Sequence, residues 1–308
     1  MIVQPRREAA RSTLPVLAAS LRPGQWTKNL LVFAGLVFGG RLLDPSAVLA
    51  AGAAFVAFCA LSGAMYLVND LCDRQADRQH PLKQARPIAA GALSGRVATA
   101  AAVALVAGGM ALAWAVAVEL AAVAGAFVVL LFLYSTSLKH VVILDVLAIA
   151  GGFVLRAIAG AVAVDVPIRH WLLTCTTLLA LFLGFSKRRH ELTLLGEDAA
   201  RHRPILGEYS PYLLDQMIAV VTASTVIAYT VFATSAETAE RLGTARLGLT
   251  IPFVLYGIFR YLYLVHQRHG GGSPAAMLLN DRPLLACIAL WAATVMLLMY
   301  SPLGRSSG

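Results

Sequence analysis

The 308-residue sequence is short of charge. Asp, Glu, Lys and Arg together make up 13% of it, whereas a soluble domain usually carries about a quarter. Hydrophobic residues make up 59%, and the mean hydropathy is +0.74. This shortage, together with long apolar runs, excludes an ordinary soluble domain and indicates a chain embedded in a bilayer. Although the length would allow two soluble domains, the composition favours one helical bundle, so we expect a single domain over residues 1–308.

Cysteines are also few, and their spacing excludes two classes of site. The four cysteines form no CxxC pair, and three of them lie in apolar runs. This pattern excludes a disulfide framework and a zinc site. The first twenty residues hold no compact apolar core, so we expect no cleaved signal peptide.

Acidic residues are outnumbered by basic ones, 16 against 25, which gives a net charge of +9. In a soluble protein this excess would suggest nucleic acid. In a membrane protein it is explained by the Lys and Arg that gather in cytoplasmic loops. We therefore expect membrane lipids and no nucleic acid among the partners, and the sequence leaves a homo-oligomer open.

The apolar runs predict the architecture. A helix needs about 20 apolar residues to cross a hydrocarbon core of ~30 Å. The boundary between the third and fourth runs is a tight connection near Glu119. We expect an all-α, nine-transmembrane-helix bundle, with spans near residues 26–41, 47–69, 97–117, 119–137, 141–163, 168–186, 215–235, 246–265 and 283–301.

The basic residues predict the orientation of this bundle. If the N-terminus lies inside, the inner segments hold 18 of the 25 Lys and Arg, and the outer segments hold 5. This bias predicts a multi-pass protein of the cell membrane with a cytoplasmic N-terminal segment, residues 1–21. Two cytoplasmic caps, residues 70–96 and 187–214, would then cover an active-site cavity that faces the cytoplasm.

The charge that the chain does carry gathers after the second run, where residues 69–77 read NDLCDRQAD. If the helix continues, Asn69, Asp73 and Asp77 follow one another about 40° apart on one face, with Asp70 beside them. Carboxylates on one stripe repel unless a positive charge lies between them. Because Mg²⁺ prefers oxygen ligands and usually also holds substrate phosphates, these four residues are candidate Mg²⁺ ligands. The alternative is a solvated helix end whose aspartates pair with nearby arginines.

The motif NDxxDxxxD, followed by HPxKxxRPIAxG at residues 80–91, resembles the UbiA superfamily of intramembrane prenyltransferases. The resemblance covers the chain from Arg22 to about Tyr300. In that superfamily the aspartates hold Mg²⁺, which in turn holds a diphosphate. The resemblance therefore implies a UbiA-type bundle, Mg²⁺ as cofactor, and Asp73 and Asp77 as catalytic residues.

One departure from the superfamily is informative. Its prenyltransferases normally carry a second acidic motif after the sixth helix, whereas this chain has Lys187, Arg188, Arg189, His190 and Glu191 there. One acidic cluster facing one basic cluster suggests a substrate with a metal-bound diphosphate and a further phosphate held directly by cations. On a helix, positions 187, 188 and 191 share a flank, while Arg189 points away, and we expect it near lipid headgroups.

Three further motifs point to one branch of the superfamily. RPGQWTKN at 22–29, YSTSLK at 134–139 and GFVLRAIAG at 152–160 resemble the decaprenyl-phosphate phosphoribosyltransferases. The resemblance implies transfer of 5-phosphoribosyl from phosphoribosyl pyrophosphate (PRPP) to a polyprenyl (decaprenyl) phosphate, a step toward cell-wall arabinan. The resemblance, together with the positions of the charged residues, predicts a set of substrate-binding residues: Lys28, Lys83, Arg86, Tyr134, Lys139, Arg156, Lys187, Arg188 and Glu191.

Several of these residues have structural alternatives. Lys28 could be an interfacial anchor, and Lys83 and Arg86 could be ordinary cytoplasmic charges. An arginine near a helix centre costs about 2.5–3.5 kcal/mol to insert, so Arg156 should face the bundle interior. Asp145 lies about 16 Å away along the helix axis, too far for a direct pair. Arg156 either lines the cavity or braces the helices.

Two other functions stay open. Another UbiA-type enzyme would move a prenyl group from its diphosphate to an aromatic acceptor, although the missing second acidic motif counts against it. A transporter would need polar residues through the membrane to both faces, whereas here they crowd at one side.

Overall fold

The computed structural model describes residues 13–81, 83–168, 170–196, 204–268, 277 and 280–301. Within these residues the chain forms helices and turns and no strand. The elements, in chain order, are α1 (Thr13–Ser20), the 3₁₀ segment η1 (Pro23–Val32), α2 (Phe33–Phe38), α3 (Pro45–Cys72), α4 (Arg74–Gln79), α5 (Gly95–Val116), α6 (Val118–Thr136), η2 (Leu138–His140), α7 (Leu144–Ala163), α8 (His170–Leu195), η4 (Pro204–Glu208), α10 (Pro211–Thr234), α11 (Ala236–Leu242), η5 (Leu247–Thr250), α12 (Ile251–Gln267) and α14 (Arg282–Tyr300).

Short polar residues start the long helices. Asp44, Ser94, Ser210 and Asp281 each accept a backbone N–H from the first turn of the helix that follows. These side chains satisfy donors that a helix start leaves without a partner. In α3, α10 and α14 a proline also occupies one of the first two positions, where its missing N–H costs nothing. The helix starts are therefore encoded locally.

Among the described residues, seven helices are long and apolar enough to cross a membrane: α3, α5, α6, α7, α10, η5 with α12, and α14. The predicted count of nine is therefore not confirmed. The first predicted span, 26–41, is divided between η1 and the short α2, and the sixth, 168–186, forms the first part of the more polar α8. The predicted tight connection before Glu119 is confirmed, since α5 ends at Val116 and Ala117 is extended, with φ −163°.

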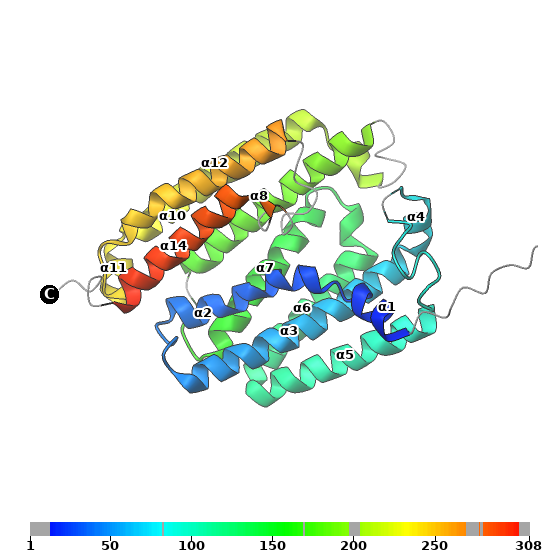
Figure 1. Ribbon diagram of the computed structural model, residues 1–308, viewed down its shortest axis with the longest axis horizontal. Coiled ribbons are helices and arrows are strands. Elements are labelled where there is room, and N and C mark those ends of the chain that lie inside the picture. The colour runs from blue at the N-terminus through cyan, green and yellow to red at the C-terminus, as the bar shows by residue number, and fades with distance from the viewer. Residues whose placement is uncertain are drawn as a thin grey trace, which may run out of the picture.

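The bundle has two sides joined by α7 (Figure 1). On one side α3 packs along α5 and α6, and on the other α8 packs along α10. Helix α7 contacts both α6 and α8 and so connects the two sides. The aromatic pairs Phe58–Phe127 and Phe182–Tyr261, with ring centroids 5.0 and 5.1 Å apart, mark the core of each side.

The segment formed by η1 and α2 packs against α7 at two glycines, Gly35 and Gly160. A Cβ on Gly160 would lie 1.9 Å from the carbonyl oxygen of Val32, and one on Gly35 would lie 2.6 Å from the backbone nitrogen of Ala161. Only residues without a side chain allow the two backbones to approach this closely. This contact holds η1, which carries Lys28, against the centre of the bundle.

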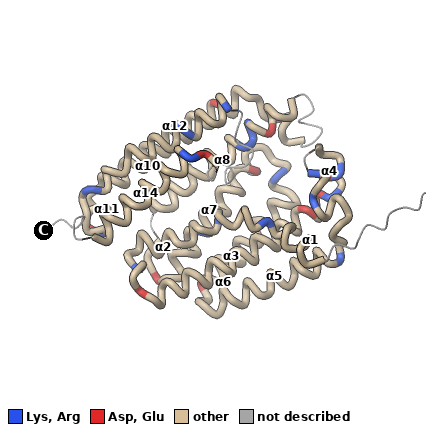
Figure 2. Tube along the Cα trace, viewed as in Figure 1, with Lys and Arg blue, Asp and Glu red and all other residues tan. Residues whose placement is uncertain are grey.

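The surface follows the expectation for a multi-pass membrane protein. Large apolar side chains such as Leu49, Trp114, Val220 and Phe259 are exposed on the outside. Few charged residues lie along the middle of the helices, and most lie near α4 and at helix ends (Figure 2). Outward apolar side chains along spanning helices suit contact with lipid, and the end of the bundle around α4 is where a polar site can form.

Candidate active site

Four residues between the end of α3 and α4 form the acidic cluster: Asn69, Asp70, Asp73 and Asp77. The predicted continuous helix is interrupted, because α3 ends at Cys72 and α4 begins at Arg74. Asp73 lies at the junction with φ −88° and ψ 2°. The i to i+4 backbone bonds nevertheless continue, from Asp73 N to Asn69 O (2.9 Å) and from Asp77 N to Asp73 O (2.8 Å), so the cluster stays on adjoining turns.

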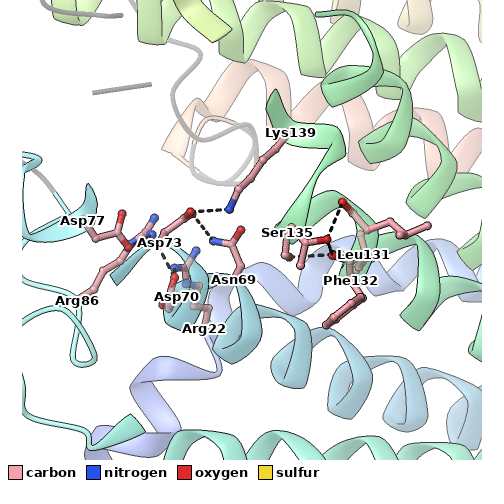
Figure 3. Close-up of polar contacts among 12 residues, drawn as sticks. Arg22, Asn69, Asp70, Asp73, Asp77, Arg86, Leu131, Phe132, Ser135 and Lys139 are labelled. Carbon is pink, nitrogen blue, oxygen red and sulfur yellow. Dashed lines mark hydrogen bonds and ion pairs between the residues drawn. The ribbon is translucent and has the colours of Figure 1, made fainter. Parts of the chain in front are cut away.

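Arginines from two other segments contact Asp70 and Asp77 (Figure 3). Nη1 of Arg86 lies 3.1 Å from Oδ1 of Asp70 and 2.6 Å from Oδ2 of Asp77. Nη2 of Arg22 lies 2.5 Å from the same oxygen of Asp70. Both carboxylates are buried. Burial raises the pKa of Asp77, and the charge of Arg86 opposes that rise.

Lys139 reaches Asp73 from the connection between α6 and α7 (Figure 3). Its Nζ lies 2.5 Å from Oδ1 of Asp73, and the Asn69 side-chain amide donates to Oδ2 at 3.1 Å. Asp73 is 27% exposed while Lys139 is 9% exposed. Asp73 is therefore the member of this ion pair that a ligand reaches more readily.

The donor chemistry of the acidic cluster fits Mg²⁺. Carboxylate and amide oxygens are the ligands that this ion prefers, and oxygens of Asp70 and Asp77 converge on one position, which holds Nη1 of Arg86. Across the described residues, no three His, Cys, Asp or Glu are grouped tightly enough to hold a metal. Because the carboxylates contact Arg22, Arg86 and Lys139 instead, Mg²⁺ would have to bind as those cations turn toward a phosphate.

The basic cluster, which consists of Lys187 and Arg188 with Glu191, lies toward the end of α8. Arg188 is fully buried: its Nε lies 2.9 Å from Oδ2 of Asp145, and its Nη1 contacts Glu191. Lys187 Nζ lies 3.9 Å from the same Glu191. Nη2 of Arg188 has no hydrogen-bond partner in the described part of the chain. A buried donor without a partner costs free energy, and an oxyanion would satisfy it.

The prediction for Arg189, the residue after Arg188, is wrong. Arg189 does not face lipid headgroups, because its Nε lies 2.5 Å from Oδ1 of Asp215 on α10. Nε2 of His266, on α12, contacts the same oxygen at 3.2 Å. The helical flank predicted for Arg189 meets neighbouring helices of the bundle, so its charge joins α8, α10 and α12.

Arg156 braces three elements. Its Nε donates to Asn29 at 2.6 Å, its Nη2 to Ser62 at 3.1 Å and its Nη1 to the carbonyl of Gly152 at 2.8 Å. Its guanidinium also lies 4.6 Å from the ring centroid of Phe127. As the helix geometry predicts, it does not pair with Asp145. Of the two alternatives, these contacts favour the brace.

The other predicted residues each lie near one of the two clusters or their partners. Lys28 is half-buried on η1, makes no ion pair with the described residues, and is near enough to Lys187, Arg156 and Arg22 to be repelled by them. Tyr134 is half-buried on α6 close to Arg188. Lys83 is half-buried beside Asp77.

The predicted cavity between the two caps is described only in part, because residues 197–203 of the second cap lie outside the described residues. Two hollows of about 580 Å³ each lie elsewhere, one between α1 and residues 85–92 and the other between α10 and α12. Neither hollow is lined by the acidic cluster, whose carboxylates form ion pairs with Arg22, Arg86 and Lys139.

Sequence reasoning does not assign a role to three residues that contact the predicted site. Arg22 enters only as the first residue of the motif RPGQWTKN, and Tyr209 lies in no motif. Asp145 is considered only as a partner for Arg156, whereas it is fully buried and contacts Arg188 and Tyr209. An acidic residue in the first turn of an apolar helix is the one signal that could have marked it as the partner of a buried cation.

The chain is similar to named relatives and to a solved structure. The chain is 33% identical over 305 residues to the decaprenyl-phosphate phosphoribosyltransferase of Mycolicibacterium smegmatis, covering 95% of each chain. It is 32% identical to the protein of that name from Corynebacterium glutamicum, covering 96% of this chain and 90% of the relative. The fold matches a solved UbiA homolog from Archaeoglobus fulgidus bound to GPP and Mg²⁺, with a TM-score of 0.72 at 20% identity over 91% of this chain and 98% of that one.

The model of the UbiA prenyltransferase family matches residues 29–281. This range begins in η1 and ends at the start of α14, so it takes in the acidic cluster, the basic cluster and the helices that carry both. With a match over most of its length, the chain belongs to the UbiA prenyltransferase family.

Proposed function

We propose that this membrane enzyme transfers the 5-phosphoribosyl group from PRPP to a polyprenyl phosphate, decaprenyl phosphate in the first instance, and releases diphosphate. The observation that carries the proposal is the pairing of an acidic cluster with a separate basic cluster, whose buried Arg188 keeps one nitrogen without a hydrogen-bond partner among the described residues. Such a site suits a substrate with two anionic groups, one on each side of a sugar. The relatives named decaprenyl-phosphate phosphoribosyltransferase support the same choice.

Each cluster would bind a different part of PRPP: the acidic cluster the diphosphate, and the basic cluster the 5-phosphate. Asn69, Asp70, Asp73 and Asp77 would hold Mg²⁺, which when bound neutralises charge on the departing diphosphate. Arg22, Arg86 and Lys139, now paired with the aspartates, would turn to the diphosphate oxygens. Lys187 and Arg188 would hold the 5-phosphate through charge-assisted hydrogen bonds.

Alignment and charge supply most of the acceleration in this scheme. The bond between ribose C1 and the diphosphate oxygen breaks through an oxocarbenium-like state, while an oxygen of the polyprenyl phosphate forms the new bond to C1. The acceptor is already an anion, so no general base is needed. A single in-line displacement inverts C1, and fixed cations on both sides hold the reactants in line.

The surroundings of the site fit a lipid acceptor. We infer that the protein lies in the cell membrane with the α4 end of the bundle in the cytoplasm, since the basic residues favour that side. Lys28, which makes no ion pair with the described residues, is the residue we assign to the acceptor phosphate. The polyprenyl tail would leave sideways between helices, because lipid dissolves it and water does not.

The test is a transfer assay with purified protein in lipid nanodiscs, given radiolabelled PRPP, decaprenyl phosphate and Mg²⁺. Label that moves to the lipid fraction only when both decaprenyl phosphate and Mg²⁺ are present supports the proposal. Transfer of a labelled prenyl group from its diphosphate to an aromatic acceptor, with PRPP inert, would replace it with the general UbiA reaction.

A further inference from the structure

Tyr209 connects the segment after η4 to the start of α7. It is buried, and its hydroxyl accepts the backbone N–H of Ile143 at 2.7 Å and donates to Oδ1 of Asp145 at 2.9 Å. Burial raises the pKa of Tyr209 to about 12, so the hydroxyl keeps its proton for this bond. Sequence motifs gave no reason to assign this residue a role.

The backbone that Tyr209 contacts is strained. Ile143 has φ 68° and ψ −44°, and the N–H of Leu144 donates to the carbonyl of Val142 at 2.8 Å. This is a tight three-residue turn that is rare, and a β-branched residue in it is an outlier. Such a conformation persists only where surrounding contacts hold it, and the Tyr209 hydroxyl supplies one such contact from a distant part of the chain.

This turn separates the residues that serve the two clusters. Lys139, which contacts Asp73, lies on η2 just before it. Asp145, which contacts Arg188, lies just after it. Any relaxation of the turn would therefore move Lys139 and Asp145 relative to each other, and with them the contacts that each makes to its cluster.

We propose that Tyr209 is a positioning residue, whose hydroxyl fixes the turn at Ile143 and the orientation of Asp145 so that Arg188 presents its free edge to the phosphate of the donor. The inference rests on the proposed function for the identity of that anion. By taking Oδ1 of Asp145, Tyr209 leaves Oδ2 facing Nε of Arg188. Nη2 of Arg188 is then the edge that remains for an oxyanion.

The kinetic test compares Tyr209→Phe with Tyr261→Phe. Tyr261 is a matched control, because it is equally buried in the same apolar cluster and its hydroxyl has no hydrogen-bond partner among the described residues. For Tyr209→Phe we expect the KM for PRPP to rise about tenfold or more, the size of a lost hydrogen bond to a charged group. The KM for decaprenyl phosphate should stay within about twofold, as should both constants in Tyr261→Phe. Equal effects in the two variants, or an unchanged KM for PRPP, would overturn the inference.

A second measurement does not depend on activity. Amide hydrogen exchange across residues 142–147, measured on the full chain in nanodiscs, should be faster in Tyr209→Phe than in wild type and unchanged in Tyr261→Phe. If wild type transfers no phosphoribosyl group, the proposed function fails, and this exchange comparison still decides whether Tyr209 holds the turn. Identical exchange in both variants would mean that it does not.

Discussion

Two arginines are buried in the described part of the helical bundle, Arg156 and Arg188, and their surroundings differ. Arg156, on α7, donates to Asn29, to Ser62 and to a backbone carbonyl, all of them neutral groups. Arg188, on α8, contacts the carboxylates of Asp145 and Glu191 and keeps one nitrogen without a partner among the described residues.

This difference distinguishes an arginine that braces the fold from one that we propose binds the donor. The donors of Arg156 are directed at three different elements, so its contacts hold η1, α3 and α7 together. Arg188 has its charge compensated within the protein, which lowers the cost of burying it. Its spare donor is the feature that a ligand can use, so burial alone does not reveal the role of a membrane arginine.

The largest expected loss of activity comes from Asp73→Asn, which tests whether the acidic cluster needs its full negative charge. Asp73→Asn removes the partner of Lys139 and a candidate Mg²⁺ ligand. We expect kcat in the transfer assay to fall by about 100-fold to 1,000-fold, the loss typical of one essential electrostatic group. Asp73 is 27% exposed but Lys139 only 9%, so the variant leaves a largely buried ammonium without its carboxylate, and we expect the melting temperature to fall as well.

The control for this variant is Cys72→Ser, at the adjacent exposed position, for which we expect a rate within about twofold of wild type. Chelation of Mg²⁺ by EDTA should reproduce the loss seen in Asp73→Asn. A wild-type rate in Asp73→Asn, or in the presence of EDTA, would contradict the assignment of the acidic cluster.

A smaller effect is expected for Arg188→Lys, which keeps the charge but loses the planar fork. Lysine cannot contact Asp145, Glu191 and a phosphate with the same geometry, so kcat/KM for PRPP should fall by about 10-fold to 100-fold. Initial rates at varied PRPP measure this loss. If the rates are normal, the spare nitrogen of Arg188 has no part in binding the donor.

The two arginines also show what could be predicted from the sequence. Local signals predicted the helical fold, the acidic cluster and the inward orientation of Arg156, because apolar runs, charge patterns and helix periodicity act over a few turns. The partners were not predictable, since Arg22 and Asp70 are 48 positions apart and Tyr209 and Asp145 are 64 apart. Tertiary packing brings such residues together, and the same packing at Gly35 and Gly160 explains how a span divided between η1 and α2 is held in the bundle.

Arg156→Lys should change stability more than chemistry. Lysine cannot reach Asn29, Ser62 and the carbonyl of Gly152 together, and we expect a loss of about 1–3 kcal/mol in the free energy of unfolding from donors and acceptors left without partners. The melting temperature in nanodiscs should fall clearly, while KM for PRPP changes less than in Arg188→Lys. A normal melting temperature with abolished transfer would reverse the comparison and make Arg156 a substrate-binding residue.

The smallest effect is expected for Arg189→Gln, one position from Arg188. Arg189 pairs with Asp215, whose side chain is 36% exposed, and a pair open to solvent contributes at most about 1 kcal/mol because water and salt screen it. Transfer should stay within about twofold of wild type, and the melting temperature should drop slightly, with a smaller drop at high salt. The variant removes a positive charge next to Arg188 but leaves the contacts of Arg188 itself in place. It therefore shows whether activity depends on the position of Arg188 or on the total positive charge of this part of α8. If Arg189→Gln loses as much activity as Arg188→Lys, the basic cluster acts through its summed charge, and the buried position of Arg188 does not explain its role.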